Sequence, residues 1–122
     1  MLTPSWQLTD PIDAIIFDCD GTLSKIEGID ELAICNDTSD IVQQLTQDAM
    51  GKSGMTIEIY DKRLKIVNPT HDSIIALGNA YIKHHTPNIL EVIAALKMLG
   101  KPIYIVSAGI HEAVAIFAKW TV

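Results

Sequence analysis

Cysteine is scarce in this sequence: Cys19 and Cys35 are the only two among 122 residues. Two cysteines are too few for a disulfide framework, and they lack the CxxC spacing of a zinc or redox site. We therefore expect two reduced thiols in a reducing compartment.

Basic residues and long apolar runs are also scarce. Nine Lys and Arg stand against fifteen Asp and Glu, which gives a net charge of −6 at pH 7. Broad binding to a phosphate backbone depends on clustered cations, so we do not expect a nucleic-acid partner. Nowhere do roughly 18 apolar residues run together, and no basic stretch followed by an apolar segment opens the chain. We expect a soluble, cytoplasmic protein with no membrane partner.

The sequence is rich enough in apolar residues to pack a core. The hydrophobic set makes up 48% and the charged residues 20% of the chain, a composition outside the range of disordered chains. The length suits one compact core and is too short for two ordinary domains.

Two short apolar runs predict buried strands. Residues 13–17 follow Pro11 and end abruptly at acidic residues. Residues 102–106 are rich in β-branched side chains and are closed by Ser107-Ala108-Gly109. Short apolar runs bounded by turn residues are typical of strands in a parallel sheet.

Between and after these runs the apolar spacing becomes helical. It predicts helices over residues 41–49, 74–82, 89–99 and 110–120. Gly51 is a candidate end of the first helix, and Asn88 to Glu91 has the pattern of a capping box. Residues 55–60 alternate apolar and polar side chains, which fits a strand or a helix. The order is strand, helical insert, helix, strand, helix, which is a βαβ unit with about 60 residues inserted after its first strand.

The first predicted strand ends in Asp18-Cys19-Asp20-Gly21-Thr22-Leu23. Carboxyl ends of parallel strands are where α/β sheets place ligands, and two carboxylates there suit a hard cation such as Mg²⁺. The same letters also fit a simple Asp-Gly turn capped by its aspartates. The spacing alone leaves both interpretations open.

Residues 17–23 resemble the first motif of the haloacid dehalogenase superfamily of phosphohydrolases. Segments 27–33, 48–51, 62–64 and 105–109 look like the successive signatures of phosphoserine phosphatases, in the same order and at similar intervals. The resemblance covers residues 12–120. It implies an α/β fold, with a Rossmann-like core and parallel sheet in residues 1–23 and 86–122, and a helical cap inserted at residues 24–85.

The resemblance implies a Mg²⁺-dependent phosphomonoester hydrolase, most closely a phosphoserine phosphatase of L-serine biosynthesis, acting on a small phosphorylated metabolite. Asp18 would be the nucleophile that forms an aspartyl phosphate. Asp20 would protonate the leaving alkoxide and then accept a proton from the attacking water. One oxygen of Asp18 and the backbone carbonyl of Asp20 would bind Mg²⁺.

The segment after the second strand would hold the phosphate. The resemblance assigns this role to the Ser107 hydroxyl and to the N–H groups of Ala108 and Gly109, close to the positive end of the following helix. Gly is usual in the family where Ala108 stands. Ser107 also fits an ordinary helix N-cap.

The cap would recognise the rest of the substrate. The resemblance places Glu27 opposite the substrate ammonium and Arg63 opposite its carboxylate, which a guanidinium binds in bidentate fashion. The family commonly has an aromatic residue near Thr56, and this sequence does not.

Two later motifs of the family are missing: a lysine that steadies the phosphoryl charge and an acidic cluster that completes the Mg²⁺ site. After Ser107 the only lysine is Lys119, and no carboxylate follows Glu112. We hypothesise that the 122 residues are an N-terminal portion of a phosphatase, or that a complementing chain or a homo-oligomer supplies the remainder. Alone, such a chain should bind Mg²⁺ weakly and turn over little or no substrate.

Three alternatives remain open at this stage. Another small phosphometabolite, or phosphotransfer to another alcohol, would retain Asp18 and Asp20. A receiver-type signalling module has this length and an acidic phospho-acceptor site, but it needs five alternating strands where two are convincing. A catalytically silent remnant could bind a partner through its exposed sheet edge.

Overall fold

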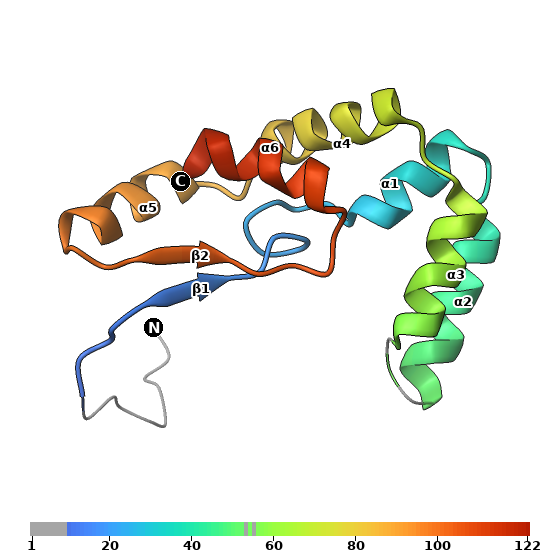
Figure 1. The fold of residues 1–122 in the computed structure, drawn as a ribbon, viewed down its shortest axis with the longest axis horizontal. Coiled ribbons are helices and arrows are strands. Elements are labelled where there is room, and N and C mark those ends of the chain that lie inside the picture. The colour runs from blue at the N-terminus through green and yellow to red at the C-terminus, as the bar shows by residue number, and fades with distance from the viewer. Residues whose placement is uncertain (1–9, 53, 55) are drawn as a thin grey trace.

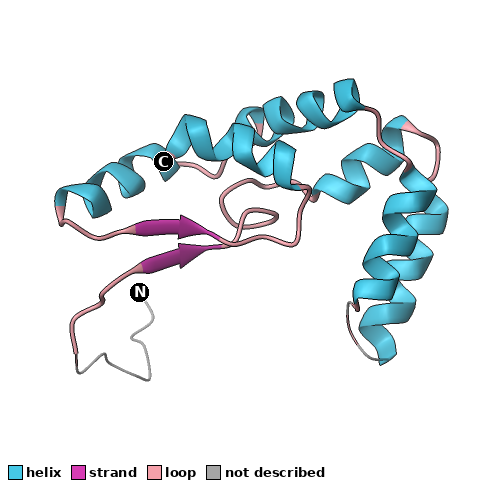
Figure 2. Ribbon diagram, viewed as in Figure 1, coloured by secondary structure: helices cyan, strands magenta, loops and turns pink. Residues whose placement is uncertain are grey.

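The structure is a computed structural model that describes residues 10–52, 54 and 56–122 (Figure 1). Helices dominate these residues, and two short strands lie side by side (Figure 2). The elements follow in the order β1 Ile15–Phe17, α1 Gly28–Cys35, α2 Ser39–Lys52, α3 Ile57–Val67, α4 His71–Lys83, α5 Ile89–Met98, β2 Ile103–Ile105 and α6 His111–Thr121.

Strands β1 and β2 are parallel neighbours. Ile15 pairs with Ile103, and Phe17 pairs with Ile105. Because parallel strands end at the same edge of a sheet, the segments after Phe17 and after Ile105 meet there. This confirms the two predicted strands, shows that they are neighbours, and places both motifs at one edge.

The core draws buried residues from the turn after β1 and from helices α1 to α6. Helices α4 and α6 run side by side on one side of the strands (Figure 1). The rings of Tyr81 on α4 and Phe117 on α6 meet edge to face at 6.4 Å between centroids, and both side chains are fully buried. The other face of the strands is open: Ile16, Tyr104 and Val106 are more than half exposed.

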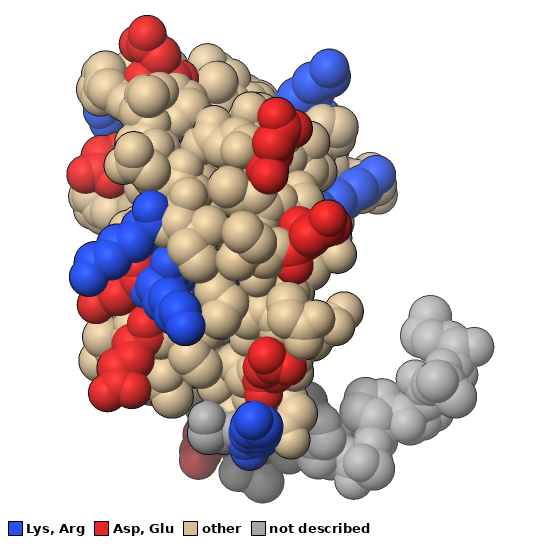
Figure 3. Space-filling model, turned by 90° about the vertical axis from the view of Figure 1, so that its right-hand side faces the viewer, with Lys and Arg blue, Asp and Glu red and all other residues tan. Residues whose placement is uncertain are grey.

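Helices α2 and α3 form an arm that extends away from the sheet (Figure 1). The fully buried residues are Val42 and Ala49 on α2 and Val67 on α3. Figure 3 shows the molecule from the right-hand side of Figure 1, and acidic and basic side chains are interspersed over that face. That face therefore has no patch of one sign.

The helices predicted from apolar spacing are all present, but two of the predicted end signals are wrong. Helix α2 continues through Gly51 to Lys52. Asn88 adopts a left-handed conformation with φ of 64° and its side chain makes no capping hydrogen bond, so there is no capping box at α5.

The ambiguous stretch near residue 57 is helical. Thr56 caps α3 by accepting a hydrogen bond from the Ile59 N–H, at 3.3 Å between Oγ1 and N, and Asn68 closes the helix in a left-handed conformation. Met55, where the ambiguous stretch begins, lies outside the described residues.

The architecture is the predicted α/β class with an incomplete core, because the sheet among the described residues has only two strands. The five alternating strands of a receiver-type module are not found in this part of the chain. None of the helices that the structure describes is long and apolar enough to cross a bilayer. The division of the chain at residues 24 and 85 stays a prediction; α4, on the cap side of it, packs along α6.

Candidate functional site

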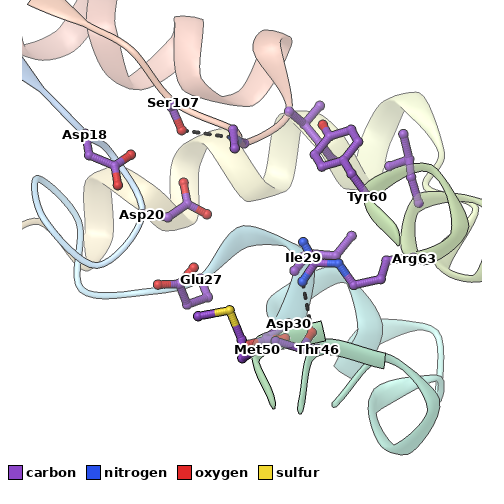
Figure 4. A pocket seen from close by; sticks show the side chains of 14 residues that line it. Asp18, Asp20, Glu27, Ile29, Asp30, Thr46, Met50, Tyr60, Arg63 and Ser107 are labelled. Carbon is purple, nitrogen blue, oxygen red and sulfur yellow. Dashed lines mark hydrogen bonds between the residues drawn. The ribbon is translucent and has the colours of Figure 1, made fainter. Parts of the chain in front are cut away.

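The predicted site residues surround one cavity of about 390 Å³ at the carboxyl ends of the two strands (Figure 4). All seven line it: Asp18, Asp20, Glu27, Arg63, Ser107, Ala108 and Gly109. Asp18 and Asp20 stand on the strand side of the cavity, and Arg63 reaches in from α3. The structure thus brings the predicted residues at 18–20, 27, 63 and 107–109 around one cavity.

A tight turn after β1 places the two aspartates. The Cys19 carbonyl accepts hydrogen bonds from the N–H groups of Thr22 and Ser24, each at 3.1 Å between N and O. Gly21 turns the chain with φ of 70°, a conformation that L side chains rarely adopt. The fully buried Ser24 hydroxyl donates to the Tyr81 carbonyl at 2.9 Å, so the turn is fastened to α4.

The two aspartates have different surroundings. Asp18 is exposed, and its Oδ1 accepts a hydrogen bond from the Cys19 N–H at 2.7 Å. Asp20 is half-buried and accepts from the Gly28 N–H at 2.8 Å and from the Tyr81 hydroxyl. The Asp-Gly turn and the carboxylate pair coexist, because the side chains take no part in closing the turn.

Between them, Cys19 is fully buried. Burial, together with the neighbouring charges of Asp20 and Asp18, raises the pKa of its thiol to about 12. Cys19 is therefore a protonated core residue at neutral pH and not a nucleophile.

Ser107 begins a turn that leads into α6. Its Oγ accepts a hydrogen bond from the Gly109 N–H at 2.9 Å, which leaves the hydroxyl proton available for a ligand oxygen. The N-cap of α6 is Ile110, so the alternative of Ser107 as an N-cap is wrong. The Gly109 N–H would have to release Ser107 before it could bind a phosphoryl oxygen.

Glu27 and Arg63 face the cavity from the predicted cap. Glu27 is the N-cap position of α1, but its side chain makes no capping bond. Partial burial and the carboxylates of Asp20 and Asp30 raise its pKa, against a smaller opposing effect of Arg63. Arg63 Nη1 donates to Thr46 Oγ1 at 3.0 Å, while its buried Nε has no hydrogen-bond partner.

Sequence reasoning missed two tyrosines. Tyr60 lies one turn after Thr56 on α3 and lines the cavity, so an aromatic ring borders the pocket although none stands at Thr56. The helical spacing of residues 74–82 placed Tyr81 on an apolar face without indicating its hydroxyl contact with Asp20. A helix over α3 places Tyr60 on the same face as Arg63, three residues later, so a helical assignment would have indicated that Tyr60 borders the pocket.

The charge of the cavity bears on metal binding. Its described lining has four carboxylates, of Asp18, Asp20, Glu27 and Asp30, and one guanidinium, that of Arg63. No group of three or more His, Cys, Asp or Glu that could hold a metal occurs among the described residues. Mg²⁺ keeps several waters and is usually bound through one or two carboxylates, so Asp18 and Asp20 fit it chemically as a partial ligand set.

Comparison with known families and proteins agrees with this geometry. Residues 12–119 match the pattern of the haloacid dehalogenase-like hydrolases. Phosphoserine phosphatases from Bos taurus and Homo sapiens are each 31% identical to the chain over 102 residues, which is 84% of this chain and 45% of each relative. The chain thus spans less than half the length of these relatives.

Solved structures show a similar fold. A phosphoserine phosphohydrolase-like protein from Francisella tularensis superposes with a TM-score of 0.76 at 30% identity, over 90% of this chain and 54% of that one. A phospho-aspartyl intermediate analogue of phosphoserine phosphatase superposes with a TM-score of 0.62 at 28% identity, over 88% of this chain and 51% of that one. With its matched pattern, its two parallel strands and the carboxylates at their ends, the chain belongs to the haloacid dehalogenase-like hydrolases.

Proposed function

We propose that this chain carries the nucleophile and the cap of a Mg²⁺-dependent phosphomonoester hydrolase that acts through an aspartyl phosphate, with phosphoserine as its substrate. The observation that carries the proposal is the meeting of Asp18, Asp20 and Ser107 at the ends of two adjacent parallel strands, in a cavity that Glu27 and Arg63 share.

The first step forms the covalent intermediate. A carboxylate oxygen of Asp18 attacks phosphorus, the bond from phosphorus to the serine oxygen breaks, and Asp20 gives a proton to the departing alkoxide. Exposure of Asp18 to the cavity suits an attacking group, while the two donors on Asp20 fix the acid beside it. In the second step water attacks phosphorus, Asp20 takes its proton, and phosphate leaves with the Asp18 carboxylate restored.

Ser107 and the start of α6 hold the phosphoryl group. The Ser107 hydroxyl donates to a phosphoryl oxygen, and the first turn of α6 adds the positive end of a helix dipole. The Asp18 carboxylate and a phosphate dianion repel one another at this edge of the sheet. Mg²⁺ held by the Asp18 carboxylate and the Asp20 carbonyl would neutralise that charge.

Glu27 and Arg63 recognise the amino acid part of the substrate. Burial raises the pKa of Glu27 most, and the neighbouring carboxylates of Asp20 and Asp30 raise it further; a substrate ammonium would relieve the repulsion among these carboxylates. Arg63 lines the cavity, and only its Nη1 is bonded to another described side chain, so Nη2 remains to donate to a substrate carboxylate. Together they favour a zwitterionic phosphate ester over a plain one.

The proposal is tested by the substitution Asp18→Asn in the protein expressed from its complete gene. We expect loss of phosphate release from phosphoserine by at least about a thousandfold, together with loss of labelling by beryllium fluoride. Asp13→Asn is the matched control, because Asp13 is exposed at the opposite end of β1 and should leave both unchanged. Undiminished rates in Asp18→Asn overturn the proposal.

The isolated 122 residues should hydrolyse phosphoserine slowly or not at all, since the described lining offers one guanidinium against four carboxylates. Rapid turnover by purified material of this length contradicts that expectation. Profiling small phosphate esters separates phosphoserine from another phosphometabolite or an acceptor alcohol, since those alternatives also retain Asp18 and Asp20.

A further inference from the structure

A buried tyrosine hydroxyl lies directly behind the proposed acid–base group. Tyr81 is on α4, its side chain is fully buried, and it is not among the residues that line the cavity. Its hydroxyl nevertheless lies 2.9 Å from Oδ1 and 3.0 Å from Oδ2 of Asp20. A phenol donates one proton, so it holds both carboxylate oxygens at once in a shared hydrogen bond.

The other donor to Asp20 comes from the start of α1. The Gly28 N–H lies 2.8 Å from Oδ2. A Cβ added at Gly28 would come within 2.2 Å of the Tyr81 hydroxyl oxygen, so this close approach requires glycine. The Gly28 N–H on α1 and the Tyr81 hydroxyl on α4 therefore both donate hydrogen bonds to the Asp20 carboxylate.

The turn that contains Ser107 and Gly109 also lies against the Asp20 carboxylate. A Cβ added at Gly109 would meet Asp20 Oδ1 at 3.0 Å, Ser107 Oγ at 3.1 Å and the Tyr81 hydroxyl at 3.2 Å. The phenol thus sits where α1, the Asp20 turn and the phosphate-side turn converge. Little room is left for the Asp20 carboxylate to rotate.

The tyrosine itself is anchored at both ends. Its carbonyl accepts the hydrogen bond from the buried Ser24 hydroxyl, and its ring packs edge to face on Phe117. Ser24 belongs to the same turn as Asp20. Two hydrogen bonds consequently join this turn to α4: one from the Ser24 hydroxyl to the Tyr81 carbonyl, and one from the Tyr81 hydroxyl to the Asp20 carboxylate.

We propose that Tyr81 is a positioning residue, whose hydroxyl fixes the Asp20 carboxylate between the first helix of the cap and the phosphate-binding turn. The inference rests on the proposed function, in which Asp20 must meet first the leaving oxygen and then the attacking water. Proton transfer requires a donor and acceptor held within hydrogen-bond reach. Tyr81 acts on the reaction through Asp20 and contacts no substrate atom.

The test is Tyr81→Phe in the polypeptide as its gene encodes it, which removes one oxygen and keeps the ring. We expect kcat with phosphoserine to fall about tenfold or more, while KM changes less than about twofold, because substrate contacts are intact. Tyr104→Phe is the matched control, since Tyr104 is 56% exposed on the open face of the sheet. An unchanged kcat in Tyr81→Phe overturns the inference.

A second measurement needs no turnover. In urea unfolding without metal, Tyr81→Phe and Asp20→Ala should be non-additive, because each removes one partner of the same hydrogen bond, and the double variant's unfolding constant should differ about tenfold from the product of the single effects. Additivity overturns the inference. If Asp18→Asn keeps full activity, the proposed function fails; if only the Tyr81 effects are absent, this inference alone fails.

Gly28→Ala provides a further variant. Because its methyl group would strike the Tyr81 hydroxyl oxygen, we expect it to lower kcat, and to cost less in the Tyr81→Phe background than alone. Equal losses in both backgrounds contradict the proposed contact.

Discussion

The strand-end turns and the α2–α3 arm meet at the same cavity, but they are held in very different ways. At the strand ends, polar groups are fixed by hydrogen bonds to α4, with Ser24, Tyr81 and Cys19 fully buried. In the arm few side chains are fully buried, and Arg63 relies on Thr46 for its contact. In the proposed function, the well-packed region carries Asp18 and Asp20, and the less packed arm carries Arg63.

The two cysteines give the largest expected contrast. Cys19 is fully buried with its pKa raised to about 12, whereas Cys35 is exposed at the end of α1. At pH 8 a thiol of that pKa is about one ten-thousandth ionised, and only the thiolate reacts. We expect alkylation of Cys35 to exceed that of Cys19 by more than about a thousandfold, measured by peptide mass spectrometry. Comparable rates would mean that the turn after β1 opens readily.

Arg63→Lys tests recognition by the arm. An ammonium cannot reproduce the bidentate fork of a guanidinium, so we expect KM for phosphoserine to rise about 10- to 100-fold with a smaller change in kcat. Phosphate esters without a carboxylate should be insensitive to this change. Lys62→Arg is the control, since Lys62 is exposed on the same helix. A fall in kcat without a change in KM would contradict a role of Arg63 in substrate binding and would indicate a role in the reaction step.

Substituting alanine for a glycine in a helix of each region compares how tightly the two regions are packed. A Cβ at Gly78 on α4 would meet Ile116 side-chain atoms at 2.6 and 2.8 Å. Overpacking of this kind costs about 1–3 kcal/mol, which exceeds the gain in helix propensity of about 1 kcal/mol. Gly78→Ala should therefore lower the free energy of unfolding in urea titrations. A stabilised variant would show that the seam between α4 and α6 is loose.

Gly51→Ala should do the opposite. Gly51 is exposed within α2, and a Cβ there meets no described atom within 4 Å. Only helix propensity changes, so we expect a gain of about 0.5–1 kcal/mol in the free energy of unfolding. A loss would indicate that this end of the arm packs against something further.

Local patterns were sufficient where an element's own apolar face sets its structure. The strands within residues 13–17 and 102–106 follow from short apolar runs bounded by turn residues, and the helices α4, α5 and α6 follow from helical apolar spacing. Helix α1 was not predicted, because its eight residues are too short for a persuasive pattern. Helix α3 was ambiguous, because residues 55–60 alternate apolar and polar side chains like a strand; in the structure, Thr56 caps a helix that begins at Ile57.

By itself the sequence determined the two short strands and the carboxylates that end the first of them, since apolar runs and turn residues are local properties of the chain, whereas the seven residues around the cavity were predicted through the family resemblance. Only the tertiary structure decided that the Tyr81 hydroxyl would meet Asp20, 61 positions away, and that Tyr60 would border the pocket. Such contacts depend on how helices pack against distant turns, and an apolar helical spacing gives the face of a tyrosine but not the partner of its hydroxyl.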